Sequence, residues 1–220
     1  GGRDVSIYDR SRDNTRVLAS VSDASHPAVF YLIDFASHRA DIVGERFPEL
    51  ANATLSPVSV IHYKARDGYD LQALLTLPPT SGGRSAPRPM VILPHGGPES
   101  QDSLDFDWWS QFIASRGYVV IQPQYRGSTG QGDAHLLAGR RQWGALMQDD
   151  LTDAVKAMVE QGIADPHRVC IVGASYGGYA ALAGAVFTPE LYACAASIGG
   201  VSSLPRLLVY KHDRIDPNLR

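Results

Sequence analysis

The sequence VCIVGASYGGYAALAGA, residues 169–185, constrains the fold more than any other part of the chain. A short apolar run, residues 169–172, is followed by Gly173, Ser175 and Gly177, and then by an alanine-rich segment. The pattern Gly-x-Ser-x-Gly between a strand and a helix forms a tight turn that holds the serine hydroxyl clear of the sheet. We therefore expect Ser175 to be a nucleophile at the strand-to-helix turn of an α/β protein.

A second signal comes from LPHGGP, residues 93–98, which follows another apolar run. A His-Gly-Gly turn after a strand commonly donates a backbone N–H to the oxyanion of an acyl-transfer reaction. We expect Gly97 to supply one such N–H and Tyr176, the residue after the serine, to supply the other. We call the strand-to-helix turn at Gly173–Gly177 the elbow. His95 precedes the strand that leads into the elbow, and we interpret it as a structural histidine of the His-Gly-Gly turn.

Strands alternate with helices from residue 89 onward. The strand-like runs are residues 89–97, 118–127, 167–175 and 192–202, and the helical ones are 105–117, 144–162 and 176–187. In the helix over 144–162, apolar residues recur at the spacing of one buried face: Met147, Leu151, Ala154, Val155 and Met158. Apolar strands that alternate with helices predict a parallel sheet covered on both faces.

The first fifty residues follow a different pattern. TRVLASVSD, AVFYLIDFAS and RADIVGE are short β-branched and aromatic runs between polar turns, which indicate an antiparallel meander of three or four strands. A meander of this size corresponds to one β-propeller blade, which cannot bury its own faces. We predict a partial propeller over residues 1–50, a linker over 51–57 and an α/β domain over 58–220, which begins with a hairpin around Arg66-Asp67-Gly68.

Charge and composition exclude several classes of function. The formal net charge is −3 and the chain has no basic cluster, so we expect neither nucleic acid nor a membrane as a partner. No run of 18 apolar residues occurs. Cys170 and Cys194 each lie in an apolar run, and we interpret them as buried free thiols. No spacing of cysteine and histidine indicates a metal site, and we expect no cofactor.

Two other features have structural interpretations. The glycine-rich stretch YRGSTGQG, residues 125–132, lacks the Gly-Lys-Ser/Thr ending and the glycine spacing of phosphate-binding loops. We interpret it as a turn at the rim of a pocket. We expect Trp108, Trp109 and Trp143 to be packing anchors rather than side chains that stack on a ligand.

Six stretches of the chain together resemble the prolyl oligopeptidase family of serine peptidases, most closely its acylaminoacyl-peptidase-like branch. They are HYKARDGYDLQALLTLP, LPHGGP, PQYRGSTGQG, WGALMQDDLTDAVKAMVEQG, DPHRVCIVGASYGGYAAL and IGGVSSLPRLL, in the family's order from about residue 58 to about residue 208. The stretch PAVFYLIDFASHRADIVGERFPEL, residues 27–50, is similar to the closing blade of the family's β-propeller. The resemblance covers nearly the whole chain.

The resemblance implies an α/β-hydrolase domain behind a propeller that admits only short peptides. It also implies acyl-enzyme chemistry on peptides, often with activity on esters. Ser175 matches the family's nucleophile, while Gly97 and Tyr176 match its oxyanion donors. We expect a cytoplasmic protein whose partner is a short peptide substrate, and a homo-oligomer stays an open alternative.

The remaining members of a catalytic triad do not fit the sequence. In α/β-hydrolases the chain order is serine, then acid, then histidine. After Ser175 the only histidine is His212, and Asp213 and Asp216 lie beyond it. Glu190 precedes His212 but falls at the far end of the helix after the elbow. We therefore expect the triad aspartate and histidine to lie outside these 220 residues.

These observations predict an internal piece of a longer protein, whose sheet is truncated after the strand that follows the elbow helix. We expect the 220-residue chain alone to have little triad activity, because an oxyanion hole without its triad retains only a residual advantage over water. Two alternatives stay open from the sequence. One is a carboxylesterase on the same fold, and the other is a non-catalytic fragment that keeps the elbow without a complete triad.

Overall fold

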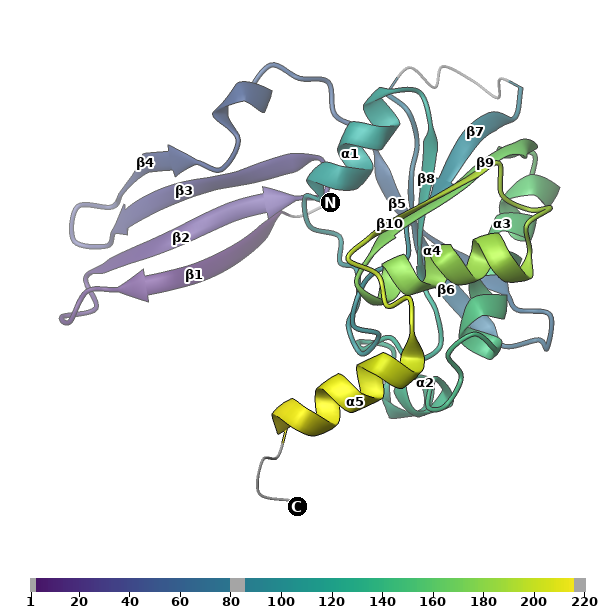
Figure 1. Ribbon diagram of the computed structural model, residues 1–220. Helices are drawn as coiled ribbons and strands as arrows, with labels where there is room; N and C mark the ends of the chain where they lie inside the picture. The colour runs from purple at the N-terminus through teal and green to yellow at the C-terminus, as the bar shows by residue number, and fades with distance from the viewer. Residues whose placement is uncertain (1–2, 80–85, 216–220) are drawn as a thin grey trace.

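A computed structural model describes residues 3–79 and 86–215, with the side chains of residues 211–215 left out. Its strands form two separate sheets, of four and six strands. In Figure 1 the four-stranded sheet projects to one side of a larger body in which helices pack on the six-stranded sheet. The predicted α/β-hydrolase body, preceded by about one antiparallel blade, is confirmed.

The four-stranded sheet is an antiparallel meander in the order β1-β2-β3-β4. Its strands are β1 (Asp4–Arg10), β2 (Arg16–Asp23), β3 (His26–Asp34) and β4 (Arg39–Glu45). The last three were expected from their β-branched and aromatic runs, whereas β1 has the polar sequence DVSIYDR and was not identified. Several large apolar side chains of the meander are exposed, among them Val5 and Ile7 on β1 and Ile42 and Val43 on β4. A sheet of this size thus leaves apolar surface uncovered, as expected of a single blade.

The six-stranded sheet has the order β10-β9-β7-β8-β6-β5. Its strands are β5 (Val58–Lys64), β6 (Asp70–Thr76), β7 (Arg88–Ile92), β8 (Val119–Gln124), β9 (Ala164–Ala174) and β10 (Cys194–Ile198). The strands β10, β9, β7 and β8 run parallel, while β6 pairs antiparallel with both β8 and β5. The sheet is therefore mixed, because the hairpin predicted over residues 58–79 joins the parallel strands at one edge.

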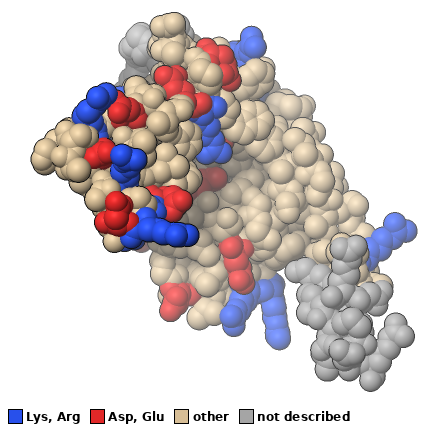
Figure 2. Space-filling view, turned by 90° about the vertical axis from the view of Figure 1, so that its left-hand side faces the viewer, with Lys and Arg blue, Asp and Glu red and all other residues tan. Residues whose placement is uncertain are grey.

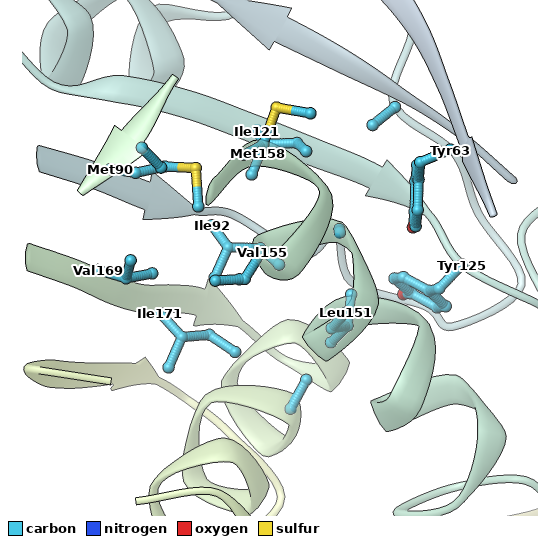
Figure 3. Close-up of a cluster of buried hydrophobic side chains, with 14 of the residues drawn as sticks. Tyr63, Met90, Ile92, Ile121, Tyr125, Leu151, Val155, Met158, Val169 and Ile171 are labelled. Carbon is cyan, nitrogen blue, oxygen red and sulfur yellow. The ribbon is translucent and has the colours of Figure 1, made fainter. Parts of the chain in front are cut away.

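Helices cover both faces of this sheet, as predicted. On one face α1 (Trp108–Ser115) packs its Ala114 against Leu93 and Val120. On the other face lie α3 (Leu146–Glu160) and α4 (Tyr176–Phe187), and the five apolar residues predicted for the α3 face are all fully buried. Figure 3 shows the core between α3 and the strands, formed by Leu151, Val155, Met158, Met90, Ile92, Ile121, Val169 and Ile171. Neighbouring strand residues such as Ile92 and Leu93 point to opposite faces, which is why both faces are apolar.

Two helices lie in segments for which no helix boundaries were predicted. The short helix α2 (Asp133–Ala138) follows the glycine-rich stretch, and His135 Nε2 lies 2.9 Å from the carbonyl oxygen of Tyr125. The helix α5 (Leu204–Ile215) extends away from the body in Figure 1. His212 and Asp213 belong to α5, but only their backbone is described. Asp216 lies outside the described residues.

One buried glutamine connects the meander, the predicted linker and α1. The side-chain oxygen of Gln111 accepts the N–H of Ser56 at 2.8 Å, and its amide nitrogen donates to the carbonyl oxygens of Ser56 and Ala24 at 3.0 and 3.1 Å. A backbone group buried without a partner is costly, so a single side chain that bonds three such groups fixes how the linker passes α1. The boundaries 1–50, 51–57 and 58–220 remain a prediction.

A buried ion-pair network holds the hairpin turn against α3. The guanidinium of Arg126 bonds Asp150 on α3 and Asp67 in the turn, with the Nη2 to Oδ1 distance to Asp150 at 2.6 Å. Asp150 is fully buried, and burial raises the pKa of its carboxyl while the contacts to Arg126 oppose that rise. Arg66 in the same turn bonds Asp153, one turn further along α3.

Cys170 and Cys194 form a disulfide, so the prediction of free thiols was wrong. The two residues are direct partners in the parallel register of β9 and β10, with Cα atoms 4.7 Å apart. Cys194 is also exposed rather than buried, because β10 lies at the edge of the described sheet. The register, which decides the pairing, follows from the crossover through α4 and cannot be read from two apolar runs.

The surface of the meander carries charges of both signs. In Figure 2, which looks onto this side of the molecule, Lys or Arg and Asp or Glu side chains interleave over the sheet. Several of them pair, including Arg16 with Asp34 and Arg39 with Asp41. Within residues 3–79 and 86–215, no helix is both long enough and apolar enough to cross a bilayer.

Candidate active site

Ser175 occupies a strained turn between β9 and α4. Its backbone dihedrals are φ 57° and ψ −117°, a combination that non-glycine residues rarely adopt. Its N–H donates to the carbonyl oxygen of Ile198 on β10 at 3.0 Å, which fixes the turn against the neighbouring strand. The side chain is exposed and caps no backbone N–H of α4. Backbone strain around an exposed hydroxyl is typical of functional positions.

The glycines of the motif are required by close packing. A Cβ at Gly173 would overlap the backbone of Gly177, and a Cβ at Gly177 would overlap the carbonyl oxygen of Pro94. A Cβ at Gly178 would lie 2.7 Å from the Cα of Gly200, beyond β10. The sequence argument for small residues on both sides of Ser175 thus has a specific geometric basis.

We expect Gly177→Ala to distort this turn, because the added methyl meets rigid backbone instead of a side chain that could move. Overpacking of this kind costs about 1–3 kcal/mol of unfolding free energy, and denaturant titration would measure the loss. The matched control is Gly44→Ala on β4, where nothing lies within 4 Å of the new Cβ. A Gly177→Ala protein as stable as the Gly44→Ala protein would contradict this account of the turn.

The turn after β7 faces the serine. A Cβ placed on Gly96 would lie 3.5 Å from the Cβ of Ser175 and 4.0 Å from its Oγ, so the Gly96 backbone borders the hydroxyl directly. Gly97 follows with φ 120°, a conformation that favours glycine, and precedes a cis peptide bond to Pro98. Within the described chain, the N–H groups of Gly97 and Tyr176 have no hydrogen-bond acceptor. Both predicted donors therefore lie in segments next to Ser175, with free N–H groups.

His95 is buried and fully engaged within the turn. Its Nδ1 lies 2.7 Å from the carbonyl oxygen of Gly96, and its Nε2 lies 2.8 Å from Oγ of Ser128. Tyr125 stacks on the ring, with centroids 4.4 Å apart, and donates its hydroxyl to the His95 carbonyl oxygen at 2.8 Å. Burial lowers the pKa of His95 to about 4, so the ring is neutral at pH 7. These contacts support the structural interpretation of His95.

Aromatic side chains pack around Tyr176, the residue after Ser175 in the elbow. The buried ring of Tyr176 packs edge-on against Trp143 at 4.6 Å and lies 5.3 Å from the ring of Tyr125. Trp143 therefore packs as predicted, and so does Trp109, which contacts the α1 core. Trp108 differs: its side chain is 58% exposed, because it lies at the start of α1 on the outward side.

The Ser175 hydroxyl has no hydrogen-bond partner among the described residues. None of the hydrogen bonds among the described residues joins a histidine ring to the Ser175 hydroxyl, and the neighbouring His95 is committed to Gly96 and Ser128. Glu190 lies beyond the end of α4, at the opposite end of that helix from Ser175. No group of three or more potential metal ligands gathers among the residues described.

Comparison with known proteins identifies the family. The profile described as the prolyl oligopeptidase family matches residues 104–214, which include the elbow, α3 and α4. The chain belongs to the prolyl oligopeptidase family. The sequence resemblance is thereby confirmed, and it extends to individual relatives. Dipeptidyl aminopeptidase BIII of Pseudoxanthomonas mexicana is 38% identical over 213 residues, which are 94% of this chain and 31% of that protein.

Solved structures of prolyl oligopeptidase family members and related peptidases share the fold. A puromycin-hydrolysing peptidase of Mycobacterium tuberculosis has a TM-score of 0.76 and 32% identity over 88% of this chain and 30% of that one. An acylaminoacyl peptidase of Pyrococcus horikoshii has a TM-score of 0.73 at 22% identity, over 92% and 32% of the two chains, and shows the fold alone. The chain spans about a third of the length of the relatives that it matches.

Proposed function

We propose that this chain carries the nucleophile of a serine peptidase that cleaves short peptides through an acyl-enzyme at Ser175. The observation that supports this most directly is the exposed Ser175 hydroxyl, held in a strained backbone conformation between β9 and α4 and bordered by the Gly96 backbone. Its relatives include proteins named as a dipeptidyl aminopeptidase and a puromycin-hydrolysing peptidase.

The reaction has two steps. In the first, Ser175 Oγ loses its proton to a histidine and attacks the substrate carbonyl carbon, and the carbonyl oxygen becomes an oxyanion. The N–H groups of Gly97 and Tyr176 stabilise that oxyanion. In comparable sites such donors lower the activation free energy by several kcal/mol. The C–N bond then breaks, and the histidine returns the proton to the leaving amine. In the second step water attacks the ester carbonyl, and the acid product and free serine are released.

We propose that the base and its acid partner lie outside these 220 residues. Three facts support this. His95 is buried, neutral and bonded to Gly96 and Ser128. The one acid between Ser175 and His212 in the chain is Glu190, which lies beyond the end of α4, at the opposite end of that helix from Ser175. The relatives are also about three times as long as the segment matched here.

A fluorophosphonate probe tests the proposal, because it reacts with a serine only where a base activates the hydroxyl. In the protein that carries these residues, we expect stoichiometric labelling, with the mass increase mapped by peptide sequencing to Ser175. Labelling at Ser128 or at no serine would refute the assignment. Comparing kcat/KM for matched peptide amides and esters would then separate a peptidase from an esterase on the same fold.

A further inference from the structure

A cavity of about 560 Å³ lies beside the turn after β7, which carries the proposed oxyanion donor Gly97 and is called the oxyanion turn below. Its lining includes Gly97, Pro98 and Glu99 from the turn after β7, and Arg140, Arg141 and Trp143 from the loop after α2. Because Gly97 both borders the cavity and belongs to the turn that faces Ser175, a group bound here would lie near the reacting carbonyl of a substrate. The volume falls in the range of pockets that hold small ligands.

The loop that carries the two arginines is fixed at both ends. Gly139 packs directly on the Gly127 backbone, where a Cβ would overlap it. At the other end the Trp143 ring packs against Tyr176, the proposed oxyanion donor, at 4.6 Å. Between them Arg141 adopts φ 59°, a left-handed conformation that a long side chain rarely takes without surrounding constraint. The guanidinium groups thus extend from an anchored backbone.

The charges of this cavity are not neutralised by the protein. Over residues 3–79 and 86–215, neither Arg140 nor Arg141 has an ion-pair or side-chain hydrogen-bond partner, and Glu99, which also lines the cavity, pairs with neither. Two guanidinium groups and one carboxylate give the cavity a formal net charge of +1. Other arginines of the chain, such as Arg66 and Arg126, are paired with aspartates.

We propose that Arg140 and Arg141 form a subsite for a carboxylate of the substrate, so that peptides with a glutamate or aspartate side chain near the cleaved bond are preferred. The guanidinium group donates paired N–H bonds that match the two oxygens of a carboxylate. Trp143 provides an apolar wall for the methylene groups of such a side chain. The proposal rests on the peptidase function proposed for Ser175.

Equilibrium binding tests the subsite without any need for turnover. The protein is the Ser175→Ala variant, and the probes are alanine tetrapeptide amides in which one position at a time is glutamate or glutamine. Each peptide is prepared with a free and with an acetylated amino terminus. The comparison separates an effect of the arginines from attraction between a charged amino terminus and the Glu99 carboxylate, which lines the same cavity. At one position we expect the glutamate peptide to bind about fivefold to tenfold more tightly, as expected of charge-assisted bonds at a partly exposed site.

Substitution of the arginines locates the effect. In the same background, the double variant Arg140→Gln, Arg141→Gln should bind the glutamate and glutamine peptides equally, whereas Arg116→Gln, an exposed arginine at the end of α1, should keep the discrimination. In the protein with its arginines the discrimination should also fall as ionic strength rises. Equal dissociation constants at every position, or a preference that survives the double substitution, would overturn the subsite. Serine labelling tests the nucleophile separately, so the two failures are distinguishable.

Discussion

Ser175→Ala is expected to reduce kcat on a peptide substrate by about 10⁵- to 10⁶-fold in the protein that carries these residues, the loss typical of removing the nucleophile of a triad. KM should change little, because the hydroxyl contributes to bond formation rather than to ground-state binding. Steady-state kinetics with a chromogenic peptide, at protein concentrations high enough to follow slow turnover, would measure both quantities.

The matched control is Ser128→Ala. Its hydroxyl also lies within hydrogen-bond distance of a histidine, 2.8 Å from His95 Nε2, but the residue is fully buried and contacts the Tyr125 carbonyl oxygen at 2.7 Å. No substrate carbonyl can reach it, so we expect kcat within about tenfold of the unmodified enzyme. If Ser128→Ala abolished turnover while Ser175→Ala retained it, the nucleophile would be misassigned.

Arg126→Met is expected to lower the free energy of unfolding by about 3–5 kcal/mol, the usual cost of removing one partner of a buried ion pair. The substitution leaves Asp150, which is fully buried, without the guanidinium that bonds both of its oxygens. It also releases Asp67 in the hairpin turn. Urea denaturation followed by tryptophan fluorescence would measure the change.

Two controls separate burial from charge. Arg168→Met removes an ion pair to Asp165 in which the arginine side chain is 55% exposed, and we expect a change below about 1 kcal/mol. Combining Arg126→Met with Asp150→Leu removes both buried charges and should recover much of the loss. A double variant no more stable than the single one would show that shape rather than charge dominates this site.

Helices whose sequence pattern is compatible with only one local structure were predicted correctly. The helix α4 begins and ends where the sequence placed it, because Gly173 and Gly177 leave only one geometry for the turn and alanines favour the helix that follows. The buried face of α3 was read from spacing alone, since five apolar residues at helical intervals admit one orientation. The family, which the comparisons confirm, was predicted from these same stretches, and the assignments of Ser175 as nucleophile and of Gly97 and Tyr176 as oxyanion donors remain proposals.

Features that depend on contacts distant in sequence were missed. The helix α2 has only six residues, so its stability comes from contacts such as His135 to the Tyr125 carbonyl oxygen rather than from its own periodicity. No function was predicted for Arg140 and Arg141. The cavity that they line together with Gly97 forms only when the loop after α2 packs near the oxyanion turn. Likewise, the sequence shows that Cys170 and Cys194 lie in two strands but not that the strands pair in register.

The disulfide between β9 and β10 also changes the connectivity of the polypeptide. It joins residues 24 positions apart, and the segment that it closes contains the elbow, Ser175 and all of α4. The proposed nucleophile therefore lies inside a covalent macrocycle. A protease that cuts once within this ring opens it without dividing the molecule, and Ser175 stays linked to both flanking strands until a reductant separates the two pieces.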